Sequence, residues 1–213
     1  MNVKKRKLWI ILNIVLFVIL VFVVLYAVAV TEPTIDKPVL YLYPDSDVKV
    51  SVNFEHPEYI KTSYPKYDNG WEVDVKTNGD IYYNGRYYYA LYWDEISQNK
   101  VDFDTGFYVE ANEAIDFLEE KLDIIGLTER EANEFIMYWL PVLEDNEKSL
   151  VYFELTEERE NYNKLIITPE PDSMLRVAIH IKKVNKKTDI KAQELSTFER
   201  NGFTVVEWGG VRY

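Results

Sequence analysis

The longest hydrophobic run of the chain lies near its start. Residues 8–30 carry no charge and only one strongly polar side chain, Asn13. A helix needs about 20 apolar residues to cross a bilayer, so this pattern predicts a transmembrane helix over 8–30. Trp9 and Tyr26 stand near the two ends of the run, where aromatic side chains anchor a helix at the membrane interface.

The charges on either side of this run predict its orientation. Four cations occupy positions 4–7, whereas Glu32, Asp36 and Lys37 follow the run. Because positively charged flanks stay on the cytoplasmic side, we expect residues 1–7 to form a cytoplasmic tail and the chain after residue 31 to be extracellular. The alternative is a secreted protein whose signal peptide is cleaved near Ala29, although the apolar cores of signal peptides are shorter, about 7 to 15 residues.

Beyond the apolar run, the first part of the chain has the two-residue period of β-strands. Residues 31–38 contain two prolines and are predicted to form a short stalk, followed by one domain over 39–213. Apolar and polar side chains alternate over 47–54, and Asn84-Gly85 is a strong signal for a hairpin loop. Strands are expected at 39–43, 47–54, 71–75, 81–83 and 86–93.

The middle of the chain changes to the period of helices. Apolar residues recur at helical spacing over 113–125, and Gly126 suits the left-handed residue that follows a helix. Thr128 and Glu131 form a capping box for a second helix, which Pro141 is expected to end. β-type patterns return at 149–155, 164–168, 175–181 and 203–208. The predicted fold class is α+β, with an N-terminal transmembrane helix followed by one mainly antiparallel β domain with an inserted helical hairpin.

Charge and composition limit the partners of this domain. The chain has a net charge of −12, and the part after residue 30 carries −16 because the four N-terminal cations are excluded. Nucleic acid binding depends on clustered Lys and Arg, so we expect no nucleic acid partner; cations, neutral glycans or basic proteins fit better. An acidic surface that only maintains solubility is the simpler alternative. The sequence predicts no oligomeric state.

The residue types present also exclude several chemistries. The chain has no cysteine and two histidines, which excludes disulfides, thiolate catalysis and a three-histidine zinc site. Residues 101–106 begin like a calcium-binding loop, but the glycine and the final glutamate do not fall at the required positions. We therefore expect neither a metal nor a cofactor.

Six motifs are specific as a set: KPVLYLYP at 37–44, DNGW at 68–71, YALYWD at 89–94, NEFIMYWLP at 133–141, PDSMLRV at 171–177 and GFTVVEWGG at 202–210. Together they resemble a group of uncharacterised, mostly exported or surface bacterial proteins with fungal relatives. The resemblance covers nearly all of the predicted domain. It implies one intact domain, and it assigns no activity and no catalytic residue.

The last of these motifs contains a candidate functional carboxylate, Glu207. Both faces of its strand are largely apolar, so we expect the strand to be covered on both sides and Glu207 to be partly desolvated. Arg176 lies on the less apolar face of its own strand and is the expected partner. Glu207 is then either a general acid or ligand carboxylate beside Trp208, or half of a structural ion pair. The glycine pair 209–210 is expected to end the strand.

Aromatic side chains crowd the segment 87–93. In a single strand, Tyr88 and Tyr92 would lie on one face and Trp93, with its alternate neighbours, on the other. One face is expected to pack, which leaves the other to present rings to a sugar or a partner protein. Asp94 follows directly, so a glycosidase pair of Asp94 with Glu207 is an alternative.

The sequence thus predicts a membrane-anchored extracellular domain that binds a glycan or a protein. Its candidate ligand contacts are Trp208, Arg176, Trp93 and Tyr92. The alternative is a carboxylate-dependent hydrolase of cell-surface polysaccharide, with Glu207 and Asp94 as candidate catalytic residues. A hydrolase requires paired carboxylates in a concave pocket, whereas a binding domain requires an exposed aromatic patch.

Overall fold

The computed structural model describes residues 9, 12–22, 34–97 and 99–213. The chain divides into two compact units, Met1–Glu32 and Pro33–Tyr213. In the first unit the described residues are helical, while the rest of the predicted tail and apolar run, including the cleavage site near Ala29, lies outside the described residues. Within the described part of the chain, no helix combines the length and the apolar character needed to cross a membrane.

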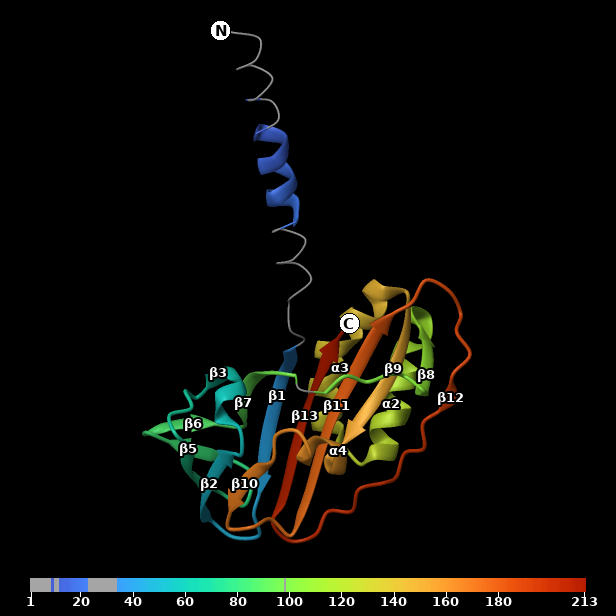
Figure 1. Ribbon diagram of the computed structural model, residues 1–213. Coiled ribbons are helices and arrows are strands. Elements are labelled where there is room, and N and C mark those ends of the chain that lie inside the picture. Colours follow the sequence, from blue (N-terminus) through green and yellow to red (C-terminus); the bar gives the residue numbers. More distant parts are fainter. Residues whose placement is uncertain (1–8, 10–11, 23–33, 98) are drawn as a thin grey trace. The chain divides into compact units, whose positions relative to one another are not determined.

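The second unit contains two β-sheets (Figure 1). The large sheet has eight strands in the order β12-β8-β9-β11-β13-β1-β7-β3, and the small sheet has five in the order β10-β2-β4-β5-β6. The large sheet consists of β1 (Thr34–Tyr43), β3 (Ile60–Tyr64), β7 (Leu91–Ile96), β8 (Thr105–Glu110), β9 (Lys148–Leu155), β11 (Ser173–Lys183), β12 (Lys191–Ala192) and β13 (Thr204–Arg212). The small sheet consists of β2 (Val48–Phe54), β4 (Trp71–Val75), β5 (Ile81–Tyr83), β6 (Arg86–Tyr88) and β10 (Leu165–Thr168).

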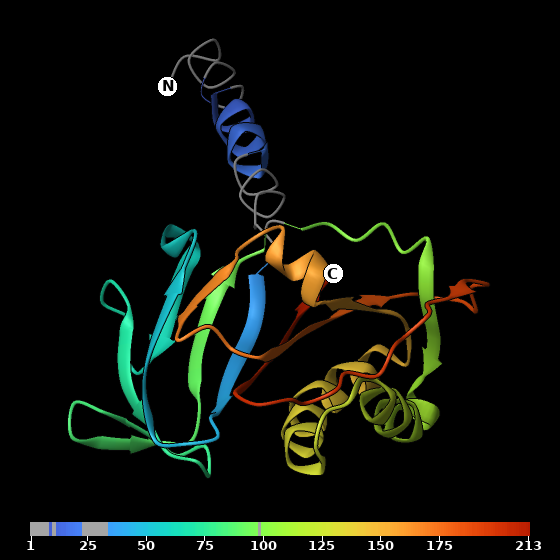
Figure 2. The ribbon, with the colours of Figure 1, turned by 90° about the horizontal axis from the view of Figure 1, so that it is seen from below.

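The described residues of this unit also form three α-helices and two short 3-10 helices. The α-helices are α2 (Ala114–Ile125), α3 (Glu129–Asn146) and α4 (Thr156–Glu160), and the 3-10 helices are η1 (Pro57–Tyr59) and η2 (Ala111–Glu113). The helices α2 and α3 pack on one face of the large sheet, and the small sheet packs on the opposite face (Figure 2).

The predicted fold class is wrong. The domain is mixed α/β with two sheets rather than one, β11 pairs with β13 in parallel, and no described helix qualifies as a membrane span. After β1 the chain alternates between the two sheets: β2 joins the small sheet, β3 the edge of the large sheet, β4 to β6 the small sheet and β7 the large sheet again. The last strand, β13, lies between β1 and β11. Local periodicity reports which residues form strands, but it carries no information about which strands become neighbours.

The central strands of the large sheet serve two hydrophobic cores. Successive strand residues point to opposite faces, so Val206 and Trp208 of β13 pack with the helices, whereas Val205 packs with the small sheet. Both cores are fully enclosed at this strand, because these three side chains are 0 % exposed. The expectation that this strand is covered on both sides is confirmed.

The first strand begins earlier than the sequence pattern indicates. Residues 34–38, predicted to belong to a stalk, are part of β1. Thr34 pairs with Ile96 of β7, and Asp36 pairs with Gly210 of β13. Backbone pairing with two neighbours thus incorporates a proline-containing segment that looks like a linker in the sequence.

The helices begin and end largely as predicted, with one exception. Gly126 adopts the left-handed conformation after α2 with φ of 99°, and the capping box of Thr128 and Glu131 starts α3. However, α3 continues through Pro141 to Asn146. A proline within a helix costs about 3 kcal/mol, and the burial of Leu143 in the core beyond Pro141 offsets part of that cost.

Two predicted strand features are also corrected. The segment 86–93 is not one strand: it bends between β6 and β7 and passes from the small sheet to the large sheet. The glycine pair does not end β13, which continues to Arg212. A Cβ atom on Gly210 would lie 2.4 Å from the Ile179 carbonyl oxygen and 2.6 Å from the Trp139 ring, so this glycine permits close packing within the ladder.

Candidate functional site

Glu207 and Arg176 are neighbours in the structure. They face each other across the parallel pair β11 and β13, and Arg176 Nε donates a hydrogen bond to Glu207 Oε2. Both side chains are buried. The ion pair expected from the sequence is confirmed, whereas a functional role for either residue stays a prediction.

This pair belongs to a larger group that we call the buried ion cluster. Its members are 0–2 % exposed and come from four strands and one helix: Glu95, Glu154, Arg159, Arg176, His180 and Glu207. Arg159 is the central cation. Its Nη2 lies 3.1 Å from Glu95 Oε1 and 3.0 Å from Glu207 Oε1, and its Nη1 lies 3.7 Å from Glu154 Oε2.

Further hydrogen bonds fix the periphery of this cluster. His180 Nε2 lies 3.1 Å from Glu154 Oε2, and His180 Nδ1 lies 2.9 Å from the Tyr213 hydroxyl. Asn163 Nδ2 donates to Glu95 Oε2 at 2.7 Å. Each buried carboxylate of the cluster therefore has at least one charged or polar partner. Among the described residues, Arg159 Nε and Arg176 Nη2 are buried without a hydrogen-bond partner.

The electrostatics of the cluster oppose acid catalysis by Glu207. Burial raises the pKa of Glu207, but the guanidinium groups of Arg176 and Arg159 outweigh burial and hold this pKa below its usual range. Burial likewise raises the pKa of Glu154, and the hydrogen bond from His180 together with the charge of Arg159 lowers it overall. A general acid needs the opposite shift, so both carboxylates are held as anions.

Asp94 does not accompany Glu207. Glu207 pairs with Leu40, which pairs with Leu91 of β7, so the alternation along β7 places Asp94 on the other face of the large sheet. There Asp94 accepts hydrogen bonds from the Tyr92 hydroxyl at 2.7 Å and from the Lys37 amide at 2.9 Å. The two candidate catalytic carboxylates therefore do not flank one cleft.

The tryptophans named as ligand contacts lie in the two cores. Trp208 is 0 % exposed, and its Nε1 donates to the Tyr41 hydroxyl at 3.2 Å. Trp93 is also 0 % exposed and packs edge-on against Phe54, with ring centroids 4.9 Å apart. Neither ring offers a surface to a ligand, because both are covered by protein on all sides.

Exposed aromatic and charged side chains instead gather on the outer face of the small sheet. Lys49 pairs with Asp74, Asp74 with Tyr82, and Tyr82 with Tyr87 across β2, β4, β5 and β6. We call these four residues the cross-strand row. All four are exposed, and the two tyrosine rings meet edge-on with centroids 6.0 Å apart.

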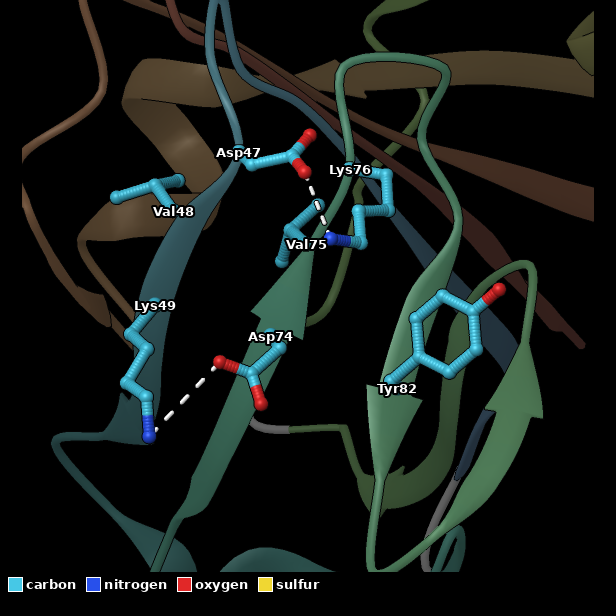
Figure 3. A pocket seen from close by; sticks show the side chains of 7 residues that line it. All are labelled: Asp47, Val48, Lys49, Asp74, Val75, Lys76 and Tyr82. Atoms are coloured by element: carbon cyan, nitrogen blue, oxygen red, sulfur yellow. Dashed lines mark hydrogen bonds and ion pairs between the residues drawn. The ribbon is translucent and has the colours of Figure 1, made fainter.

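A shallow pocket of about 390 Å³ lies against this row (Figure 3). Figure 3 shows Asp74 between Lys49 and the ring of Tyr82. Lys49 Nζ lies 3.8 Å from Asp74 Oδ1, and Lys76 Nζ donates to Asp47 Oδ2 at 2.6 Å. The pocket thus combines one aromatic ring with two lysines and two aspartates. Among the described residues, no group of His, Cys, Asp or Glu could hold a metal ion.

The sequence contained a signal for this row that its interpretation missed. The alternation over 47–54 already placed Lys49 on the polar side of its strand, and Asn84-Gly85 predicted the hairpin that sets Tyr82 beside Tyr87. Asp74 completes the row only through the pairing of β4 with both of its neighbours. The hydrophobic period of a single strand does not predict which strands pair with it.

The fold and its surface define a two-sheet, mixed α/β domain with a buried ion cluster and an exposed aromatic sheet face. No family model and no solved structure matches the chain. A segment of 61 residues is 33% identical to a protein of Butyrivibrio fibrisolvens described as "Uncharacterized protein in bglA 3'region". The match covers 27% of this chain and 64% of that protein, so it spans less than two thirds of the relative.

Proposed function

We propose that the domain of residues 34–213 binds a neutral glycan on the outer face of the small sheet. The observation that carries this proposal is the pocket beside Tyr82, in which an exposed ring adjoins paired charged groups. A sugar ring presents C–H groups on its faces and hydroxyl groups around its edge. The Tyr82 ring suits the first, and the aspartate and lysine side chains suit the second because they accept and donate hydrogen bonds respectively.

The charge balance of the pocket favours a neutral ligand over a charged one. Two lysines face two aspartates, and each lysine is already paired with a carboxylate. A ligand hydroxyl can bridge such a pair without leaving an unmatched charge. The pocket volume of about 390 Å³ also falls in the range of small-molecule sites, about 300–1,000 Å³, which supports a sugar rather than a protein surface as the ligand.

The protonation states support binding rather than hydrolysis. The hydrogen bond from Lys76 lowers the pKa of Asp47, and the hydrogen bond to Asp47 raises the pKa of Lys76. Both groups therefore stay ionised near neutral pH. Since a glycosidase needs one carboxylic acid that keeps its proton, Asp47 is suited to accept hydrogen bonds and not to protonate a leaving group.

The test compares two tyrosine substitutions in binding to neutral polysaccharides. Insoluble xylan, cellulose, mannan and starch are incubated with the protein, with polygalacturonate as the acidic comparison, and the bound fraction is measured. Tyr82→Ala should weaken binding to the neutral polymer that the parent protein retains by about tenfold, the loss of about 1.4 kcal/mol expected for one stacked ring. Tyr89→Ala is the matched control because Tyr89 is 48 % exposed but stacks on Arg130 outside the pocket.

Equal binding by both variants would contradict the proposal, as would a preference for polygalacturonate. The hydrolase alternative gains no support from Asp94 and Glu207, which lie on opposite faces of the large sheet. The extracellular location, which gives access to a cell-surface glycan, stays a prediction. Protease added to intact cells should digest residues 34–213 if it holds.

A further inference from the structure

The strand β10 forms an open edge of the small sheet. It ends the strand order, with β2 as its one neighbour in the described part of the chain. The amide of Glu55 donates to the Lys164 carbonyl at 2.9 Å, which sets the alternation of the antiparallel pair. Ile166 and Thr168 therefore direct their backbone groups toward β2, and Leu165 and Ile167 direct theirs away from it.

A groove of about 710 Å³ runs beside this edge. The groove is lined by β10, by Glu170 and Pro171 in the loop before β11, and by Met174 of β11. The Ile166 side chain is 47 % exposed there. The groove thus offers an unpaired strand edge together with apolar surface, which is the combination that accepts an extended peptide as an added strand.

The charges around the groove select the kind of peptide. Three carboxylates line it, those of Glu55, Glu160 and Glu170, against one cation, Lys164. A second copy of this chain pairing through the same edge would bring like charges together, because a twofold interface places each patch against itself. A segment with lysine or arginine side chains meets no such repulsion and gains from the complementary charge.

We propose that the β10 groove binds an extended, basic peptide segment of a partner protein by strand addition. At present the outward amide of Leu165 donates to Glu160 Oε1 at 3.4 Å, a long contact that a peptide carbonyl replaces at shorter range. Glu160 keeps its ion pair with the Arg176 guanidinium. This site is separate from the glycan pocket, because the lining residues of the two pockets do not overlap.

The experiment uses labelled ten-residue peptides in which lysine alternates with valine, and their binding to the full chain is measured by fluorescence polarisation. A peptide in which lysine alternates with proline has the same charge, but proline removes every second amide and fixes φ at about −65°, which disfavours a regular β-strand. The double variant Glu55→Lys with Glu170→Lys removes the acidic rim, and both glutamates are exposed. The double variant Glu119→Lys with Glu144→Lys makes the same change in overall charge and is the control, since both residues are exposed and neither lines the groove.

The Lys-Val peptide should bind at least tenfold more tightly than the Lys-Pro peptide. The variant Glu55→Lys with Glu170→Lys should lose at least tenfold in affinity, while the control Glu119→Lys with Glu144→Lys changes little. Equal binding of the two peptides would overturn strand addition. An equal loss with the control variant would show attraction to the acidic protein as a whole. Concentration-dependent dimers of the parent protein in sedimentation, dissociated by neither peptide, would instead identify a second copy as the occupant.

Discussion

The buried ion cluster and the outer face of the small sheet use the same charged groups in opposite surroundings. In the cluster, the Arg176 and Glu207 side chains are 0 % and 1 % exposed. On the outer face, Lys76 and Asp47 are 46 % and 56 % exposed. An ion pair is therefore accessible to a ligand only where it is exposed to water. There the ligand replaces bound water at little cost.

The energetics of the two regions differ for the same reason. Removing one partner of a buried pair leaves an uncompensated charge in the interior, which costs about 3–5 kcal/mol. Breaking an exposed pair returns two hydrated groups to solvent and costs about 0–1 kcal/mol. The cluster is therefore expected to contribute to the integrity of the domain, and the outer face to its binding.

The largest expected effect follows from Arg176→Met. The substitution keeps an unbranched apolar stem but removes the guanidinium beside Glu207, so the free energy of unfolding should fall by about 3–5 kcal/mol. Urea denaturation followed by circular dichroism measures it. A change below about 1 kcal/mol, the size typical of surface pairs, would show that the cluster and the outer face are energetically alike.

A second expected effect is a pH dependence of stability that arises from the buried ion cluster. The pKa values of Glu154 and Glu207 are lowered in the folded protein from an ordinary value of 4.5. Their contribution to stability is thus fully present above about pH 4.5 and is lost as the pH falls through the folded-state values. Urea midpoints measured from pH 7 to pH 3 should decrease below about pH 4.5, as this linkage requires.

Glu154→Gln provides the control for this pH dependence. The amide keeps the shape of the side chain but no longer titrates, so the decrease in the urea midpoint below pH 4.5 should be shallower than in the parent protein. An identical decrease in both proteins would assign the acid sensitivity to carboxylates outside the cluster.

The smallest effect on stability is expected for Lys76→Met on the outer face. The unfolding free energy should change little, because exposed ion pairs contribute little net stability, and the difference should shrink in 1 M salt, where the screening length is about 3 Å. Binding to the neutral polysaccharide should nevertheless weaken. The loss caused by Arg176→Met should persist in salt, because buried pairs are screened less. A stability loss for Lys76→Met as large as that for Arg176→Met would remove the distinction.

Part of the fold could be predicted because it depends on local chemistry. The pattern of 175–181 correctly placed Arg176 within a strand that brings it beside Glu207, and the capping residues correctly started α3. The predictions that failed concern competition between local preference and packing. Pro141 did not end α3, and the bend after β6 could not be recognised, because burial elsewhere decides both outcomes.

The candidate sites were predictable to a similar extent. Glu207 and Arg176 were expected as partners, yet Arg159, which contacts three carboxylates, lies in a short acidic helix with no distinctive pattern. The cross-strand row depends on register among four strands. The register of strands that are far apart in the sequence depends on how the hydrophobic cores pack. No single segment of the sequence specifies that packing.

The position of β13 has a consequence for the folding of the protein during translation. This strand lies between β1 and β11 and contributes to both cores, yet it follows every other strand in the order of synthesis. Until Thr204–Arg212 has left the ribosome, β1 and β11 have no strand between them and neither core can close. The apolar strands synthesised earlier therefore stay uncovered until β13 emerges, a period in which exposed strand edges promote aggregation.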